Sequence, residues 1–181
     1  MSSHSDHSRQ DLPAPEKAAR RAAIVGVYAA LALIFSYIEA VFPFQAGIPG
    51  VKLGLANLVI VLALYEMGAG YALGINFIRV VMAGLLFTGL YGMLYSLAGS
   101  IASFFVMWVL YRLGRNSVIG VSMAGGVAHN FGQLTVAAIA VSTGRLFLYF
   151  PVLVFSGTAA GITVGIGAML LLDHLPRRLF V

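Results

Sequence analysis

Two clusters of polar side chains interrupt the long apolar stretches of this sequence. Arg79 lies within one apolar run, three residues after Asn76, so a helix would carry both side chains on one face. His129, Asn130 and Gln133 lie within another run, in the stretch AHNFGQ. A fixed cation, two kinds of amide and an imidazole supply both charged and neutral hydrogen bonds, the chemistry that holds a small polar or anionic molecule.

A third group of polar residues lies within residues 49–64, PGVKLGLANLVIVLAL. A Pro-Gly turn precedes Lys52, and Asn57 follows within the apolar run. Lys52 either binds an anion or extends its ammonium group to a membrane interface. Asn57 either contacts a ligand or bridges two helices. Glu39, at the end of the preceding apolar run, is expected to lie near Arg79, where it could neutralise the guanidinium in an internal ion pair.

The composition indicates an integral membrane protein. Of the 181 residues, 60% are hydrophobic and 9% are charged, and the mean hydropathy is +0.95. Uncharged runs at residues 80–111, 116–144 and 146–172 exceed the roughly 20 residues that cross a bilayer. A charged group at the centre of a bilayer costs about 2.5–3.5 kcal/mol, so the buried polar residues should face a cavity or each other. The sequence has no cysteine, which excludes disulfides and thiolate metal sites.

The apolar runs predict an all-α bundle of six transmembrane helices. Pro and Gly residues separate these runs and mark the loops. The expected helices cover residues 22–42, 53–67, 71–88, 93–112, 117–141 and 146–172. Residues 1–20 are expected to form a disordered polar and basic tail, residues 21–175 the membrane domain, and residues 176–181 a basic C-terminus.

The distribution of basic residues predicts the orientation. Cytoplasmic segments of membrane proteins carry an excess of Lys and Arg, so here the basic residues report topology and do not indicate nucleic-acid binding. One side would hold Arg9, Lys17, Arg20, Arg21, Arg112, Arg115, Arg177 and Arg178, and the other only Lys52 and Arg145. Both termini are therefore expected in the cytoplasm, as in a multi-pass protein of the cytoplasmic (inner) membrane.

Stripes of small residues mark faces where helices can approach closely. Gly157, Gly161 and Gly165 recur at four-residue spacing in the last apolar run, and Ala22, Gly26 and Ala30 in the first. Each stripe either packs within the bundle or docks another membrane subunit. The first stripe is the better docking candidate, because it begins at the expected cytoplasmic edge.

Five stretches in order, PGVKLGLANLV, FIRVVMAGLLFTG, LYSLAGS, GVAHNFGQL and PVLVFSGTAAGI, resemble the Gx transporter family, which is also labelled heptaprenyl diphosphate synthase component I. The resemblance extends over about residues 22–172. This family is similar to the substrate-binding S components of energy-coupling-factor (ECF) transporters. The resemblance implies six helices and a ligand pocket near the outer face. It also implies that the first helix, through Ala22, Gly26 and Ala30, docks on a transmembrane coupling subunit driven by separate ATPases. The pocket is expected at Lys52, Asn57, Arg79, His129, Asn130 and Gln133.

These observations predict a membrane transport protein and not an enzyme. It would capture a small anionic or amphipathic molecule, of the flavin or isoprenoid-phosphate class, at the outer face, and no cofactor or metal is expected. The sequence has no GxxxxGK[ST] phosphate loop, so an ATPase would be a separate protein.

The alternative is a noncatalytic membrane subunit associated with polyprenyl (heptaprenyl) diphosphate synthesis. Catalysis of that reaction needs Mg²⁺ on clustered carboxylates, because the metal stabilises the departing diphosphate. The acidic residues of this chain are scattered: Asp6, Asp11, Glu16, Glu39, Glu66 and Asp173.

Overall fold

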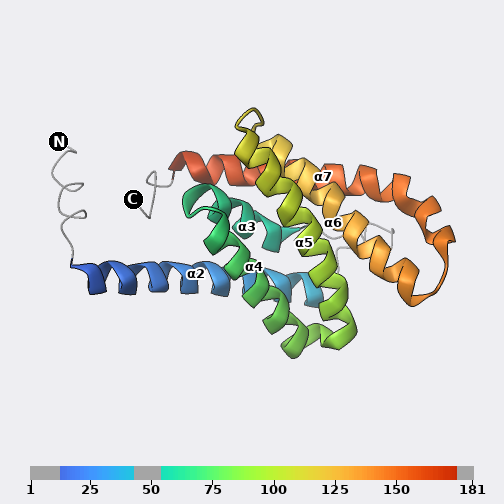
Figure 1. Cartoon of the computed structure of the whole chain (residues 1–181), viewed down its shortest axis with the longest axis horizontal. Coiled ribbons are helices and arrows are strands. Elements are labelled where there is room, and N and C mark those ends of the chain that lie inside the picture. The colour runs from blue at the N-terminus through green and yellow to red at the C-terminus, as the bar shows by residue number, and fades with distance from the viewer. Residues whose placement is uncertain (1–12, 43–53, 175–181) are drawn as a thin grey trace.

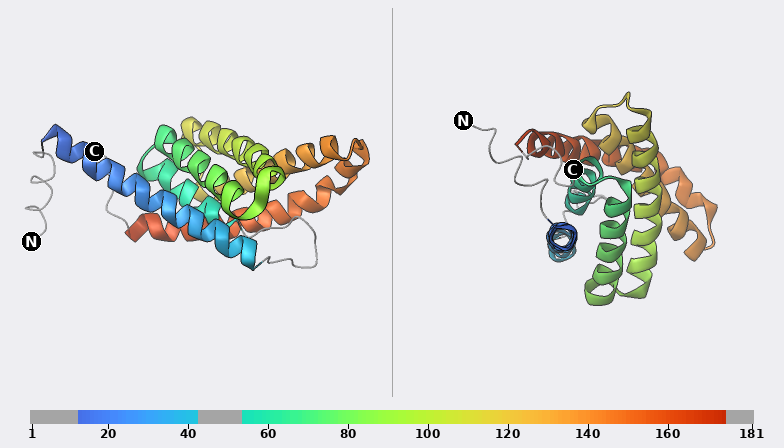
Figure 2. Two further views of the ribbon diagram at one scale, coloured as in Figure 1. Left: turned by 90° about the horizontal axis from the view of Figure 1, so that it is seen from below. Right: turned by 60° about the vertical axis from the view of Figure 1, so that its left-hand side comes forward.

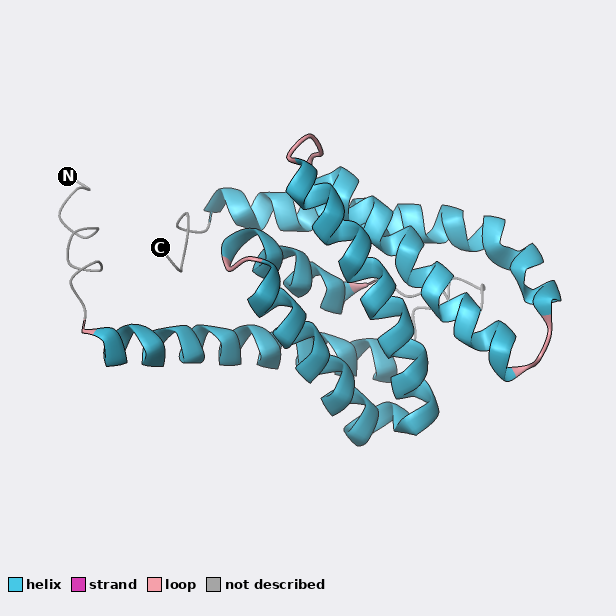
Figure 3. Cartoon of the chain, in the orientation of Figure 1, coloured by secondary structure: helices cyan, strands magenta, loops and turns pink. Residues whose placement is uncertain are grey.

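The computed structural model describes residues 13–42 and 54–174, and this part of the chain is helical, with no strand. This part contains six α-helices in chain order, α2 to α7 (Figures 1 and 3), with a π-helical turn, Gly84–Thr88, between α4 and α5 and a 3-10 turn, Gly144–Tyr149, before α7. The α-helices are α2 (Ala14–Val41), α3 (Leu55–Glu66), α4 (Ala69–Ala83), α5 (Gly89–Leu113), α6 (Val118–Ala140) and α7 (Phe150–His174). The predicted all-α fold class is confirmed.

Within the described residues, three helical segments are long and apolar enough to cross a membrane: Ala14–Val41, Ala69–Leu113 and Gly144–His174. Large apolar side chains on these segments are exposed, including Phe155 at 79% and Leu85 at 70%. Lipid is the environment that accommodates an apolar surface of this extent. The protein is therefore a membrane protein.

Helix α3 forms the centre of the apolar core. Seven of its 12 residues are buried, and the buried set includes consecutive residues from Val59 to Leu64. A helix that is apolar on every side is buried on every side. Its 12 residues extend about 18 Å at about 1.5 Å per residue, shorter than the roughly 30 Å hydrocarbon core of a bilayer. The surrounding helices therefore enclose α3, and the core continues onto α2, α4, α5 and α7.

The other helices are arranged around α3 as neighbouring pairs. Figure 1 shows α2 and α7 running along the long axis of the molecule in opposite directions, so the start of α2 and the end of α7 lie toward the same side. Helices α4 and α5 form a hairpin that crosses this axis obliquely (Figures 1 and 2), and α6 packs along both α5 and α7.

The glycine stripe of α7 packs within the bundle, as one of the two interpretations of the sequence predicts. A Cβ atom on Gly161 would lie 2.6 Å from the Cα of Met123, and one on Gly165 would lie 2.7 Å from the Cα of Ile119, both in α6. Such distances are too short for any side chain larger than hydrogen. The two helix backbones are thus in direct contact, which is the close approach that small residues permit in membranes.

Helix α2 begins at Ala14, so the expected disordered tail ending at residue 20 is wrong for residues 14–20. The sequence APEKAARRAA is rich in strong helix formers, and Pro15 occupies the first turn, where proline is tolerated. The stripe of Ala22, Gly26 and Ala30 is exposed, and a Cβ on Gly26 would meet no atom within 4 Å. This stripe therefore does not pack within the described part of the bundle.

The contact between α6 and α7 predicts a selective effect of glycine substitution. Gly161→Ala should lower the unfolding midpoint, because the added Cβ would meet backbone atoms of Met123 and force the helices apart, at about 1–3 kcal/mol for an overpacked site. Gly74→Ala is the matched control, since Gly74 lies in mid-helix in α4 with open space around it. The control should be neutral or slightly stabilising, because Ala has the higher helix propensity. Equal midpoints in a detergent unfolding assay would contradict the close packing.

Candidate functional site

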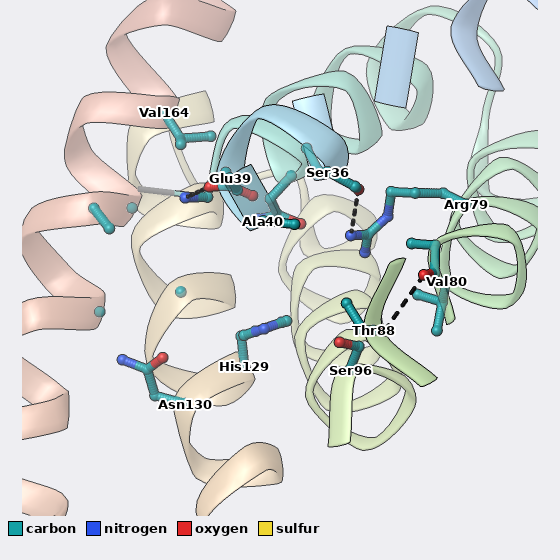
Figure 4. A pocket seen from close by; sticks show the side chains of 18 of the residues that line it. Ser36, Glu39, Ala40, Arg79, Val80, Thr88, Ser96, His129, Asn130 and Val164 are labelled. Carbon is teal, nitrogen blue, oxygen red and sulfur yellow. Dashed lines mark hydrogen bonds between the residues drawn. The ribbon is translucent and has the colours of Figure 1, made fainter. Parts of the chain in front are cut away.

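A pocket of about 350 Å³ lies between the helices, and each of α2 to α7 contributes to its lining. This volume is at the lower end of the range for small-molecule sites, roughly 300–1,000 Å³. Figure 4 shows side chains from separate helices directed toward the same space. The lining comprises Ser36, Glu39, Ala40, Gly54, Ala56, Asn57, Arg79, Val80, Ala83, Phe87, Thr88, Ser96, Gly126, His129, Asn130, Ser156, Gly157, Ala160, Gly161 and Val164.

Arg79 provides the fixed positive charge of the pocket. Its Nη2 donates to Oδ1 of Asn76 at 2.7 Å, as expected for residues three apart on one helix face. Its Nη1 donates to Oγ of Ser36 at 3.5 Å (Figure 4). The Nε atom is buried and makes no hydrogen bond within the described residues. A guanidinium has five N–H donors, and leaving a buried donor without an acceptor costs about 1–3 kcal/mol. Arg79, whose side chain lines the pocket, therefore has a donor that no described residue satisfies.

Glu39 does not form the predicted ion pair with Arg79. Instead its Oε1 accepts hydrogen bonds from the backbone N–H groups of Gly54, at 2.6 Å, and Leu55, at 2.9 Å. These donors lie at the start of α3, where the first N–H groups of a helix lack partners and the helix dipole favours a negative charge. Glu39 thus caps α3 from α2, and both it and Arg79 line the pocket as separate charges.

Glycine is required where Glu39 reaches α3. Gly54 has a φ of +76°, in the left-handed region that other residues rarely adopt. This conformation directs the first two N–H groups of the turn toward the carboxylate. Neither the carboxylate nor the glycine signals this contact in the sequence, because the two residues are separated by 15 positions.

The two predicted amides that line the pocket use their nitrogens to bond other parts of the protein. Nδ2 of Asn130 donates to the carbonyl of Leu153 at 2.8 Å and to Oγ of Ser156 at 3.4 Å, which ties α6 to α7. Nδ2 of Asn57 makes a long contact of 3.9 Å with the sulfur of Met107. The Oδ1 atoms of both amides accept no hydrogen bond from a described residue.

Four of the six predicted ligand-binding residues come together in the structure: Asn57, Arg79, His129 and Asn130 all line this pocket. Gln133 does not. It is only 3% exposed and packs on α5, where a Cβ on Gly99 would lie 2.7 Å from its Cγ. One helical turn separates it from His129, which is enough to place it beyond the cavity. Lys52 lies outside the described residues.

Sequence reasoning missed one wall of the pocket. The π-helical turn Gly84–Thr88 contributes Phe87 and Thr88 to the lining. π-helical turns within α-helices are frequent at functional sites, but they have no reliable sequence signal. Ser36 was missed as well, although it precedes Glu39 by three residues and so shares its helix face.

The role of Glu39 as a cap predicts different effects for two substitutions. Glu39→Ala should lower the free energy of unfolding by about 1–2 kcal/mol, because the N–H groups of Gly54 and Leu55 would lose their acceptor. Glu39→Gln keeps an acceptor oxygen and should retain most of the stability. Unfolding of both variants in mixed micelles compares them, and equal losses would show that the carboxylate charge, rather than its acceptor oxygen, stabilises α3.

Comparison with known proteins identifies a family. The sequence profile of the family described as heptaprenyl diphosphate synthase component I matches residues 28–171. This range includes every described residue of the pocket. No curated protein and no solved structure matches the sequence. Because the profile covers well over half of the chain, the protein belongs to the heptaprenyl diphosphate synthase component I family.

Proposed function

We propose that this protein is the substrate-binding subunit of a membrane transporter, similar to the S components of ECF transporters. It captures a small anionic or amphipathic molecule, of the flavin or isoprenoid-phosphate class, and presents it for transport across the cytoplasmic membrane. In this proposal the chain itself is not an enzyme, and the energy comes from separate ATPases through a transmembrane coupling subunit.

The observation that carries this proposal is a pocket of about 350 Å³, within an otherwise apolar helix bundle, that contains a buried guanidinium with an unused donor. Charged groups inside membrane proteins are costly and commonly mark a binding site or a transport path. A bundle that served only as an anchor would gain stability by replacing Arg79 with an apolar residue. A ligand with an acidic or carbonyl oxygen would satisfy the remaining donors.

The proposed topology has six membrane spans with both termini in the cytoplasm. The excess of Arg and Lys at the ends of the chain and between α5 and α6 supports this orientation. The opposite directions of α2 and α7 agree with an even number of spans (Figure 1). The exposed stripe of Ala22, Gly26 and Ala30 would then face the membrane, where a coupling subunit could pack against it.

A second function, support of a synthase, is favoured by the family description itself. In that case the chain would be a noncatalytic membrane partner of a heptaprenyl diphosphate synthase. In the part of the chain that the structure describes, no three His, Asp or Glu side chains group as metal ligands. The chain would therefore contribute membrane attachment or product binding, and the partner would hold the catalytic metal.

The direct test is to identify the molecule that co-purifies with the protein. Protein extracted in mild detergent should release a flavin-class or isoprenoid-phosphate compound on denaturation, detected by absorbance and mass spectrometry. A preparation that is empty and binds neither class when supplied would contradict the transport proposal. Co-purification with a prenyl diphosphate synthase, instead of a coupling subunit, would favour the second function.

Removing the charge of Arg79 should weaken ligand capture without affecting membrane insertion. Arg79→Gln should weaken binding by about tenfold or more, because a charge-assisted hydrogen bond contributes about 1.5–3 kcal/mol. His129→Ala should also weaken it, since His129 lines the same pocket. Arg112→Gln, at the exposed end of α5, is the matched control and should bind like wild type. Normal binding by both pocket variants would place the site elsewhere.

A bulky residue in the α2 stripe should impair association with a coupling subunit but not ligand binding. Gly26→Leu adds a side chain into open space, so the fold and ligand binding should be preserved while association with a coupling subunit is lost. The measurement is co-purification of the coupling subunit with the tagged variant, with ligand content quantified in the same sample. Undiminished co-purification would show that α2 does not dock through this face.

A further inference from the structure

The pocket presents several hydrogen-bond acceptors to a ligand. Oε1 of Glu39 bonds the start of α3, but Oε2 accepts no hydrogen bond from a described residue and is not among the fully buried atoms that lack one. Oδ1 of Asn57 and Oδ1 of Asn130 likewise accept no hydrogen bond from a described residue, and the nitrogens of both amides contact other helices. The three residues, from α2, α3 and α6, line the same cavity, and each has an acceptor oxygen without a donor from a described residue.

The fixed positive charge of the pocket lies on another side. Arg79 extends from α4 beside Ser36 and Val80, and Figure 4 shows it across the cavity from Asn130. Its charge is not cancelled by direct contact with Glu39, whose carboxylate lies at the start of α3. A ligand in the pocket would therefore contact the Arg79 cation at one end. Its other parts would contact the Glu39 carboxylate and the two amide side chains.

We propose that the pocket selects a ligand with several N–H or O–H donors and at most one negative charge, and that Glu39 determines this specificity. The inference rests on the proposed binding function and narrows its ligand class. A donor-bearing ring or polyol satisfies Glu39, Asn57 and Asn130, while one carbonyl or acidic oxygen binds Arg79. A ligand without donors would leave these acceptors without hydrogen bonds. Polar sites reject analogues that lack the matching group for this reason, because an unpaired buried acceptor is costly.

A diphosphate is the wrong ligand for this lining. It carries more than one negative charge and offers acceptors almost exclusively, so it would leave the amide oxygens unpaired. Bringing it to Arg79 also brings it near the Glu39 carboxylate, which lines the same pocket, and like charges placed close together repel. Glu39 therefore excludes diphosphates and favours donor-rich molecules.

The experiment compares two probes by equilibrium dialysis in detergent: riboflavin, which is uncharged and has an imide N–H and several hydroxyls, and isopentenyl diphosphate. Wild type should bind riboflavin more tightly than the diphosphate. Glu39→Gln keeps an oxygen for the α3 cap but replaces the free acceptor with an NH₂ donor. It should weaken riboflavin binding by about tenfold and strengthen diphosphate binding.

Two further variants test whether the change in specificity is due to the charge of Glu39. Glu16→Gln is the matched control in the same helix, since Glu16 is exposed in the first turn of α2, and it should leave both affinities unchanged. Asn57→Leu removes a neutral acceptor of similar size; it should weaken riboflavin binding without improving diphosphate binding.

Tighter binding of the diphosphate by wild type, or a riboflavin-to-diphosphate ratio that Glu39→Gln leaves unchanged, would overturn the inference while leaving the binding function intact. Binding of neither probe by wild type or by any variant would overturn the proposed function, and this inference with it.

Discussion

The burial of one guanidinium in an apolar helix bundle is the constraint that the rest of the structure must satisfy. A charged guanidinium at that position is costly unless polar groups or water surround it. Its neighbours Asn76 and Ser36 satisfy two donors, and Nε remains without a partner in the described structure. The need for a polar space next to Arg79 explains why the helices separate into a pocket at this position instead of packing closely as they do around α3.

The pocket keeps its shape because two different contacts hold its walls. On one side, Glu39 joins α2 to the start of α3 through two backbone hydrogen bonds. On the other, Gly157 and Gly161 let α7 lie directly on α6, and Asn130 fastens the same two helices through the Leu153 carbonyl. Both contacts use residues that also line the cavity. In the proposed function, a bound ligand would contact the groups that set the spacing of the helices, and this would give a physical route from an occupied pocket to a change in helix positions.

Much of the fold could be predicted from the sequence, because apolar runs and the Gly and Pro residues between them determine the helices and their approximate ends. Helix α2 was the exception: its polar first turns have high helix propensity but none of the apolar signal that marks the rest. The pocket was predicted through Arg79, Asn57, His129 and Asn130, since polar groups in apolar helices must converge. The role of Glu39 and the position of Gln133 could not be predicted. The first depends on how the end of α2 lies against the start of α3, and the second on the rotation of α6 about its axis. No local sequence pattern specifies either.

An experimental structure of the protein purified from its native membrane, at a resolution that shows small molecules, tests the central claim most directly. The account predicts density for a bound molecule in the pocket, with an oxygen atom within hydrogen-bonding distance of Arg79 and donor groups facing Glu39. A structure in which the guanidinium is fully bonded to protein groups, with the helices closed over it and no cavity between α2, α4 and α6, would contradict the account.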